Sequence, residues 1–499
     1  MKGEKTRRLT PIMGWASWNC FRTNISETLL REQAKALVDT GLSECGYKYL
    51  NMDDGFQGGR DSNGRIRFHK ERFPNGIKII ADYAHSLGLC AGIYADAGDN
   101  TCGYYYDQEG CNGEGVGLYG HEAQDLFIYL EDCGFDFIKV DWCGGVRLGL
   151  NEEEQYTRIG NIIEEIRQRT GKHIVYNICR WQFPGAWAVN VADSWRTAAD
   201  IHPSFSSIMH QIDNIKPLRK YSGPGHVNDL DMMQLGNGMS YTEEKTHFSM
   251  WCMMSTPLVI GCDLTKVQKS TLEILKNKEM IAVNQDEACL QAFVTKEIRA
   301  SNNNSLLAEV WVKDLGCTLS KRKAVAFLNR SGEELVISIS ARDIGLEGKF
   351  VNIRDVWRHR TLNENVGQSM FSVNVESHGV EVFVIEGENA MAVNDIFEMS
   401  DVPEVGMYVE EITDIKFEAL KAEGAVLVDV RTEDEYKYSC EDGAINLPYM
   451  DIHGTANSVL TNKNTPIIVY CSTGKRSMQA GQSLKYLGYK NVYRWKRKG

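Results

Sequence analysis

Between residues 12 and 263 the sequence alternates eight times between a short β-rich run and a stretch that is compatible with a helix. Such alternation is typical of a parallel sheet whose strands are joined by crossover helices. Helix candidates include 26–40, 120–133 and 152–170, and the last of these has isoleucines at helical spacing. Eight strand and helix units predict a closed (β/α)8 barrel. The β-rich runs are 12–17, 47–54, 90–96, 135–142, 174–179, 194–200, 226–232 and 257–263.

Most of these runs end in an acidic or basic side chain. In a (β/α)8 barrel the carboxyl ends of the strands meet at the catalytic face. A single aspartate at such a position is often a helix cap, but a ring of charged residues around one mouth favours an active site. The residues are Asp53, Asp54, Asp96, Asp141, Arg180, Asp200, Asp231 and Asp263.

Two of these aspartates, Asp141 and Asp200, form the preferred catalytic pair. Hydrolysis of a glycosidic bond needs one carboxylate at the anomeric carbon and one protonated carboxyl group at the leaving oxygen. Asp141 follows Lys139 at a spacing that places both side chains on one face of a strand, where the lysine would keep a carboxylate ionised. Asp200 follows Arg196, which could orient a sugar hydroxyl or a carboxylate. The alternative for these four residues is a structural ion-pair network.

Tryptophans expected at the same mouth favour the catalytic interpretation, because the apolar face of a sugar ring fits an aromatic platform. They are Trp15, Trp18, Trp142, Trp181 and Trp195. The net charge of −12 leaves no basic stripe for nucleic acid or for an anionic membrane surface, so a neutral substrate fits better. His121 and Glu122 have no second histidine in register, and no metal or other cofactor is expected.

The 14 cysteines are scattered along the chain and match neither a small disulfide scaffold nor a zinc site. Most are therefore expected to be free and buried. This usage favours a cytoplasmic protein, and an exported protein that has lost its signal peptide is the alternative.

The sequence changes character after the predicted barrel, which we assign to residues 9–285. Alternating β patterns with turn residues predict an antiparallel β sandwich over 286–386. Residues 387–406 lack strong periodicity and are interpreted as a linker, and 407–499 as a separate small α/β unit. The predicted sandwich strands are 306–313, 324–329, 335–340, 350–356 and 380–386.

Over residues 9–386 the sequence resembles glycoside hydrolase family 27, the family of α-galactosidases and α-N-acetylgalactosaminidases. The resemblance implies a barrel followed by a β sandwich, and a double displacement with retention at the anomeric carbon. It is carried by the blocks Met13-Gly14-Trp15-Ala16-Ser17-Trp18, 49–54, Arg72-Phe73-Pro74-Asn75-Gly76, Gly92-Ile93-Tyr94-Ala95-Asp96, Lys139-Val140-Asp141, Trp195-Arg196 with Asp200, Asn228-Asp229-Leu230-Asp231-Met232 and Asn284-Gln285-Asp286.

By this resemblance Asp141 is the nucleophile and Asp200 the general acid/base, acting on a small-molecule or oligosaccharide α-galactoside. It also implies a disulfide between Cys102 and Cys143 beside the nucleophile. The residues expected to contact the substrate are Trp18, Asp53, Asp54, Lys139, Arg180, Trp181, Arg196, Asp231 and Met232.

The sequence departs from the family pattern where sugar specificity is set. Arg180 replaces a glutamate, which affects contacts near the 2-hydroxyl, and Gly55 replaces a cysteine. The Asp53 and Asp54 pair favours galactose over a pentose that lacks the 6-hydroxyl group. The alternatives in the same pocket are an α-N-acetylgalactosaminidase and a β-L-arabinopyranosidase.

In the C-terminal unit, the apolar run 466–471 ends in Cys471, and a turn and a helix-compatible stretch follow it. Backbone N–H groups and the helix dipole at such a position favour a thiolate, and Lys475 and Arg476 add positive charge. The alternative is a buried cysteine at the end of a strand.

The unit resembles a rhodanese domain through 428–431, 443–448 and 471–477, which implies a persulfide carrier at Cys471 and a sulfur donor as partner. It departs from the family at Cys440-Glu441-Asp442, where a Gly-His pair is usual. Three classes of function therefore compete: a glycosidase with an accessory domain, a sulfurtransferase with a sugar-binding barrel, and a metal-dependent barrel enzyme. The paired carboxylates favour the first.

Overall fold

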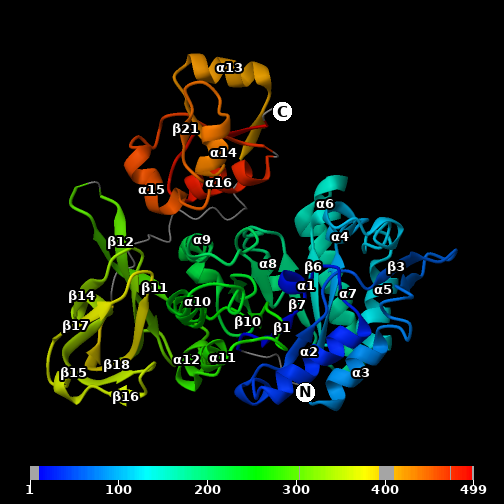
Figure 1. Cartoon of the computed structure of the whole chain (residues 1–499), viewed down its shortest axis with the longest axis horizontal. Coiled ribbons are helices and arrows are strands. Elements are labelled where there is room, and N and C mark those ends of the chain that lie inside the picture. The colour runs from blue at the N-terminus through cyan, green and yellow to red at the C-terminus, as the bar shows by residue number, and fades with distance from the viewer. Residues whose placement is uncertain (1–9, 303, 393–408, 473, 497–499) are drawn as a thin grey trace.

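The computed structural model describes residues 10–302, 304–392, 409–472 and 474–496, and Figure 1 shows the barrel, the β sandwich and the C-terminal unit in chain order. The predicted multidomain α/β architecture is confirmed. Among the described residues, no helix combines the length and apolar character needed to cross a lipid bilayer.

The barrel is an eight-stranded parallel sheet in the order β10-β1-β2-β5-β6-β7-β8-β9. A parallel bridge between Met233, just after β9, and Ile260 of β10 joins the two ends of this sheet. Each predicted β-rich run contains one strand. The strands are β1 (Met13–Ala16), β2 (Tyr49–Asn51), β5 (Cys90–Asp96), β6 (Phe137–Asp141), β7 (Val175–Cys179), β8 (Ser194–Arg196), β9 (Val227–Asp229) and β10 (Leu258–Ile260).

The helices around the barrel follow their sequence signals. Helix α7 (Glu152–Thr170) begins at the N-cap Asn151, ends at Gly171 in a left-handed conformation and buries Ile159, Ile163 and Ile166. The predicted helix 120–133 is α5 (Glu122–Leu126) continued by a π-helical turn at Phe127–Asp132. The others are α1 (Trp18–Phe21), α2 (Glu27–Asp39), α3 (Lys78–Ser86), α4 (Cys102–Tyr106), α6 (Cys143–Leu148), α8 (Ala188–Val191), α9 (Phe205–Ile215), α10 (Tyr241–Met253), α11 (Lys269–Leu275) and α12 (Lys278–Asn284). The hairpin β3 (Gln57–Arg60) and β4 (Ile66–Phe68) lies outside the barrel sheet.

The β sandwich packs a six-stranded antiparallel sheet against the pair β14 and β17, around a core that includes Val310, Phe327, Ile337 and Phe383. Strand β18 continues to Ala390, so the linker predicted from residue 387 begins inside a strand. Residues 393–406 of that linker lie outside the described residues. The strands are β11 (Phe293–Arg299), β12 (Leu306–Asp314), β13 (Arg322–Asn329), β14 (Leu335–Ser340), β15 (Leu346–Asp355), β16 (Arg360–Thr361), β17 (Met370–Val375) and β18 (Val380–Ala390).

Buried ion pairs join the sandwich to helix α9 of the barrel. Arg330 binds both carboxylate oxygens of Asp213, at 2.9 and 2.6 Å, and also Glu309. Lys216 bridges the same two carboxylates. Because breaking one partner of a buried pair leaves an uncompensated charge, this network fixes the position of α9 on the sandwich.

The C-terminal unit is a five-stranded parallel sheet in the order β19-β23-β22-β20-β21. Separate apolar clusters pack on it, one around Val469 and one around Tyr470, as expected when neighbouring strand residues face opposite sides. Helix α16 lies on the side of this unit nearest α9 (Figure 1). The elements are β19 (Glu410–Ile412), α13 (Asp414–Ala422), β20 (Val426–Asp429), α14 (Glu433–Tyr438), β21 (Ile445–Asn446), α15 (Ile452–Val459), β22 (Ile467–Cys471), α16 (Lys475–Tyr486) and β23 (Val492–Lys496).

Candidate active site

A cavity follows the barrel axis. Its deep end is apolar, with Ile12 and Phe137. Towards the carboxyl ends of the strands it carries a layer of charged side chains, Asp53, Lys139, Arg196 and Asp231. Since a strand rises about 3.3 Å per residue, the Cα atom of Asp141 lies about 6–7 Å beyond that of Lys139 on the same face of the strand.

Lys139 connects two carboxylates in this layer. Its Nζ lies 2.9 Å from Asp53 Oδ2 and 3.8 Å from Asp141 Oδ2. The ammonium also lies 5.8 Å from the centroid of the Trp18 ring and 5.1 Å from that of Tyr94. The cation therefore holds the two carboxylates together next to aromatic side chains.

The electrostatic balance leaves Asp141 ionised at neutral pH. Burial raises the pKa of Asp141 to about 6, although the Lys139 ammonium acts in the opposite direction. The charge of Asp200 raises this pKa further, which places the two aspartates within electrostatic range of one another. The side chain of Asp141 is 5% exposed and that of Asp200 is 47% exposed. The arrangement is a deep carboxylate facing a second, half-exposed one.

Arg196 shapes the loop that carries Asp200. Its guanidinium donates to the carbonyl oxygens of Ala198 and Ala199, at 3.1 and 2.8 Å, and lies 3.4 Å from Asp200 Oδ1. It also pairs with Asp231 Oδ2 at 2.7 Å, and the same oxygen accepts from the N–H of Ile201 at 3.0 Å. Asp231 has a φ of 82°, a left-handed conformation that costs energy outside glycine and often marks a functional site.

Backbone N–H groups, one of them from α4, fix the position of the Asp54 carboxylate. Its carboxylate accepts from the N–H groups of Gly103 at 2.6 Å and Gly55 at 2.8 Å. Burial, with a further contribution from Asp53, raises the pKa of Asp54 to about 7. Asp54 thus joins the charged layer to the segment that begins at Cys102.

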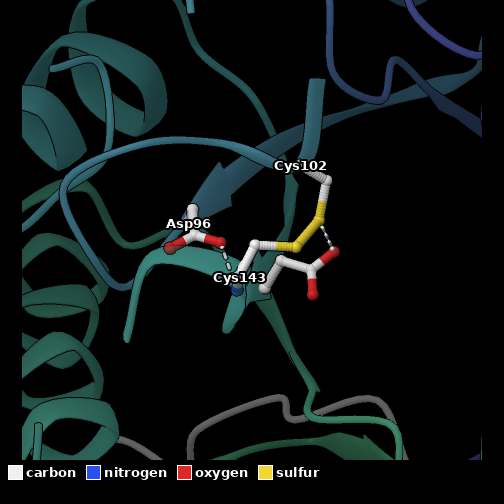
Figure 2. Close-up of side chains that lie close together, drawn as sticks. Asp96, Cys102 and Cys143 are labelled. Atoms are coloured by element: carbon white, nitrogen blue, oxygen red, sulfur yellow. Dashed lines mark hydrogen bonds between the residues drawn. A yellow bond between two sulfur atoms is a disulfide. The ribbon is translucent and has the colours of Figure 1, made fainter. Parts of the chain in front are cut away.

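A disulfide joins Cys102 and Cys143 next to Asp141. The Oδ2 atom of Asp141 lies 3.4 Å from Cys102 Sγ. Figure 2 shows this bridge beside Asp96, which accepts hydrogen bonds from the backbone N–H groups of Cys143 at 2.7 Å and Gly144 at 3.0 Å. Asp96 therefore caps α6 and is not part of the charged layer.

The same four side chains have ligand atoms within 4.8 Å of one another, as a metal site would require. They do not form a suitable ligand set, because the two sulfur atoms are bonded to each other and metals bind thiolates. The Asp96 carboxylate already accepts hydrogen bonds from three backbone N–H groups. The cluster instead fixes the backbone around Asp141.

Three of the five tryptophans predicted at the mouth lie elsewhere, which corrects that expectation. Trp15 and Trp195 are fully buried in the main core, and Trp142 stacks on Tyr156 with ring centroids 4.9 Å apart. Side chains alternate between the inside and outside of a barrel strand. Trp195 lies between Ser194 and Arg196, which line the cavity, so it points towards the helices. Trp18 and Trp181 are partly exposed; Trp18 lies beside Lys139, and Trp181 lines a cavity against the C-terminal unit.

Arg180 turns towards α7, where its Nε donates to Glu152 Oε2 at 2.7 Å. Its expected contact with substrate stays a prediction. Asp263 bonds to Gln33 and Lys266 in a loop and does not line the central cavity. The remaining expected contacts, Trp181 apart, lie in or around the charged layer, and Met232 lines the cavity.

Sequence reasoning missed a polar network in the cavity wall. The Nδ2 atom of Asn177 lies 2.8 Å from Ser194 Oγ and 2.8 Å from Asp229 Oδ2. All three residues line the cavity. The available signal was a single amide in the otherwise apolar, fully buried strand β7.

The geometry predicts the effect of Lys139→Gln on the pH profile. Loss of the ammonium removes the charge that lowers the pKa of Asp141, so the Asp141 carboxyl group would ionise only at higher pH. We expect the acid limb of kcat/KM, near pH 6 in the native protein, to move to higher pH and the maximal kcat/KM to fall. The matched control is Lys78→Gln, whose side chain is 58% exposed on α3. An acid limb that stays in place would show that Lys139 does not act on the titrating carboxylate.

The C-terminal unit presents a separate candidate site at the end of β22. Cys471 Sγ accepts hydrogen bonds from the backbone N–H groups of Gly474 at 3.2 Å and Ser477 at 3.3 Å. Arg476 forms a two-point ion pair with Glu435, at 2.6 and 2.7 Å. A loop of N–H groups that converge on one sulfur atom is suited to an anionic sulfur species.

Comparison with known proteins agrees with this organisation. Residues 10–286 match the family model described as alpha galactosidase A, and 307–385 match the alpha galactosidase C-terminal beta sandwich domain. Residues 415–497 match the rhodanese-like domain. The chain is 40% identical to alpha-galactosidase 3 of Arabidopsis thaliana over 75% of this chain and 82% of that protein.

Solved structures share the fold of the barrel and the sandwich. Alpha-galactosidase I from Mortierella vinacea aligns with a TM-score of 0.67 and 26% identity, over 78% of this chain and 100% of that one. The alpha-galactosidase from Saccharomyces cerevisiae, solved with raffinose, aligns with a TM-score of 0.64 and 24% identity, over 76% of this chain and 97% of that one.

Proposed function

The chain belongs to glycoside hydrolase family 27, the α-galactosidase family, and is a galactose-releasing glycosidase; we propose that Asp141 is its nucleophile and Asp200 its general acid/base. The observation that carries this assignment is the contrast between the two side chains. Asp141 is buried beside an ammonium group, and Asp200 is half exposed within electrostatic range of it. A nucleophile must stay ionised, and an acid must reach the outgoing group and solvent.

The reaction then proceeds in two displacements. An oxygen of Asp141 attacks the anomeric carbon, and Asp200 donates its proton to the glycosidic oxygen as that bond breaks. Asp200 next removes a proton from water, which attacks the same carbon and releases Asp141. Two inversions give net retention at the anomeric carbon.

The charged layer supplies the contacts for the galactose ring. Asp53 and Asp54 are positioned to accept hydrogen bonds from the 4- and 6-hydroxyl groups, and Lys139 to donate to the 3- and 4-hydroxyls. The pairing of Lys139 with Asp53 and the backbone donors to Asp54 hold these groups in place before substrate binds. Such preorganisation reduces the entropy lost on binding.

The substrate class we propose is a terminal α-galactoside, either an aryl glycoside or an oligosaccharide. We expect a panel of nitrophenyl glycosides to give the highest kcat/KM with α-galactoside, a lower value with α-N-acetylgalactosaminide and little turnover of β-L-arabinopyranoside. The missing 6-hydroxyl group accounts for the last of these. The reverse order of kcat/KM values would show that Arg180 and the loop after it change which sugar the pocket prefers.

A second activity, sulfur transfer, is supported by the N–H groups that surround Cys471. The thiolate would attack the sulfane sulfur of thiosulfate, displace sulfite and become a persulfide. Cyanide would then take the outer sulfur as thiocyanate and return the thiolate.

We expect Cys471→Ser to lower thiocyanate formation to the uncatalysed rate, because a hydroxyl group cannot form a persulfide. Cys440→Ser, at an exposed cysteine of the same unit, is the control and should retain the rate. Equal rates in native protein and Cys471→Ser would assign the unit a role other than sulfur transfer.

A further inference from the structure

The C-terminal unit is docked on the barrel beside the loop that carries Asp200. Gln482 of α16 donates a hydrogen bond to the side chain of Gln182, and the Ser483 hydroxyl donates to Asn214 Oδ1 of α9 at 3.4 Å. Gln479, Gln482 and Ser483 are 8%, 9% and 1% exposed. One face of α16 is thus withdrawn from solvent.

Residues of both domains line a small cavity at this contact. Gln479 and Gln482 line it from the C-terminal unit, and Trp181 lines it from the barrel. The barrel wall also includes residues 197–199, which lead directly to Asp200. The docked unit therefore covers the base of the acid/base loop.

Tyr449, which follows β21, makes a further contact between the C-terminal unit and the barrel. Its ring packs edge-on against His210 of α9, with centroids 5.5 Å apart. Burial raises the pKa of the Tyr449 hydroxyl to about 12; the Arg476 charge lowers it, and the Asp200 charge raises it. His210 lines the same inter-domain cavity as Ala199, the residue before Asp200, so Tyr449 lies next to the wall that leads to the proposed acid/base.

The proposed reaction identifies the leaving group of the substrate as the part that would approach Tyr449. The proton of Asp200 goes to the oxygen of the leaving group, so the leaving group lies on the outer, exposed side of Asp200. In the proposed reaction the charged layer takes the galactose ring, so the leaving sugar must occupy the mouth. An aromatic ring at that place can pack on the apolar face of a sugar.

We propose that the rhodanese-like unit forms one wall of the glycosidase mouth, with Tyr449 as a specificity-determining residue that contacts the sugar leaving group. This inference rests on the function proposed for Asp141 and Asp200. It gives the tethered unit a role in the barrel's own reaction that does not depend on its sulfur chemistry.

The test compares two substrates that share galactose and differ in the leaving group. Raffinose has a sugar leaving group that reaches the mouth, whereas fluoride in α-galactosyl fluoride is too small to reach it. We expect Tyr449→Ala in the full chain to lower the ratio of kcat/KM for raffinose to kcat/KM for the fluoride by about three- to tenfold, the effect of losing one aromatic contact. Gln482→Arg, which places a larger charged group in the docked interface, should lower the same ratio.

Tyr438→Ala is the matched control, because Tyr438 lies in the same unit and is 93% exposed. Its ratio should equal that of the native protein. An unchanged or higher ratio in both Tyr449→Ala and Gln482→Arg overturns the proposed wall, provided that the native protein hydrolyses the fluoride. If the native protein hydrolyses neither substrate, the function proposed for the barrel fails instead.

Discussion

Replacing Asp141 with Asn is expected to lower kcat/KM for aryl α-galactosides by about 10⁴- to 10⁶-fold, the loss seen when a covalent nucleophile is removed. The amide has nearly the same shape as the carboxylate but cannot form the glycosyl-enzyme bond. Lys139 keeps its 2.9 Å contact with Asp53 in the variant, so the charged layer should stay intact. The measurement is steady-state hydrolysis with the unfolding midpoint recorded in parallel.

A small external nucleophile then identifies the role of Asp141. Asp141→Gly opens space beneath the anomeric carbon, and azide should restore turnover of an activated substrate by direct attack from that side. A single displacement inverts the centre, so the product should be β-galactosyl azide. Asp82→Asn, which changes a 58% exposed carboxylate on α3, is the control and should retain activity. Full hydrolysis by Asp141→Asn would exclude this residue as the nucleophile.

Replacing Asp200 with Ala is expected to give a loss that depends on the leaving group. Raffinose needs a proton at its glycosidic oxygen, so its kcat/KM should fall by about 10²- to 10⁴-fold, the usual contribution of a general acid. A dinitrophenyl galactoside leaves without a proton, so its kcat/KM should fall far less. Because the Asp200 side chain is 47% exposed, its removal should have little effect on folding.

Azide again separates the roles, since in Asp200→Ala it would attack the glycosyl-enzyme formed on Asp141. Two displacements retain the configuration, and the expected product is α-galactosyl azide. The opposite anomer would exchange the roles of the two aspartates. Equal losses for raffinose and the dinitrophenyl substrate would remove Asp200 from proton transfer.

The sequence was sufficient to place the barrel strands, because buried parallel strands are continuous apolar runs. It was less informative for the sandwich. Strand β11 contains Lys296, Glu297 and Arg299, and β17 has only two buried residues, so neither has a strong apolar pattern. The end of β18 was missed because its pairing with β15 depends on tertiary contact.

The candidate site was predictable where the chemistry lies at strand ends, as with Lys139 and Asp141. The orientation of Trp15 and Trp195 could also have been obtained from strand alternation, because their neighbours face the cavity. The contact between His210 and Tyr449 could not, since it joins two domains far apart in sequence. The ion pair of Arg180 with Glu152 likewise depends on the placement of α7.

The single bridge between Met233 and Ile260 makes the β9–β10 junction the least hydrogen-bonded seam of the barrel. Lys313, which projects from β12 of the sandwich, contacts the segments that precede and follow β10 in the sequence. Its ammonium donates to Ser255 Oγ and to the carbonyl oxygens of Cys252 in α10 and Val283 in α12. The sandwich therefore ties together α10 and α12, the two helices on either side in sequence of the strand that closes the barrel.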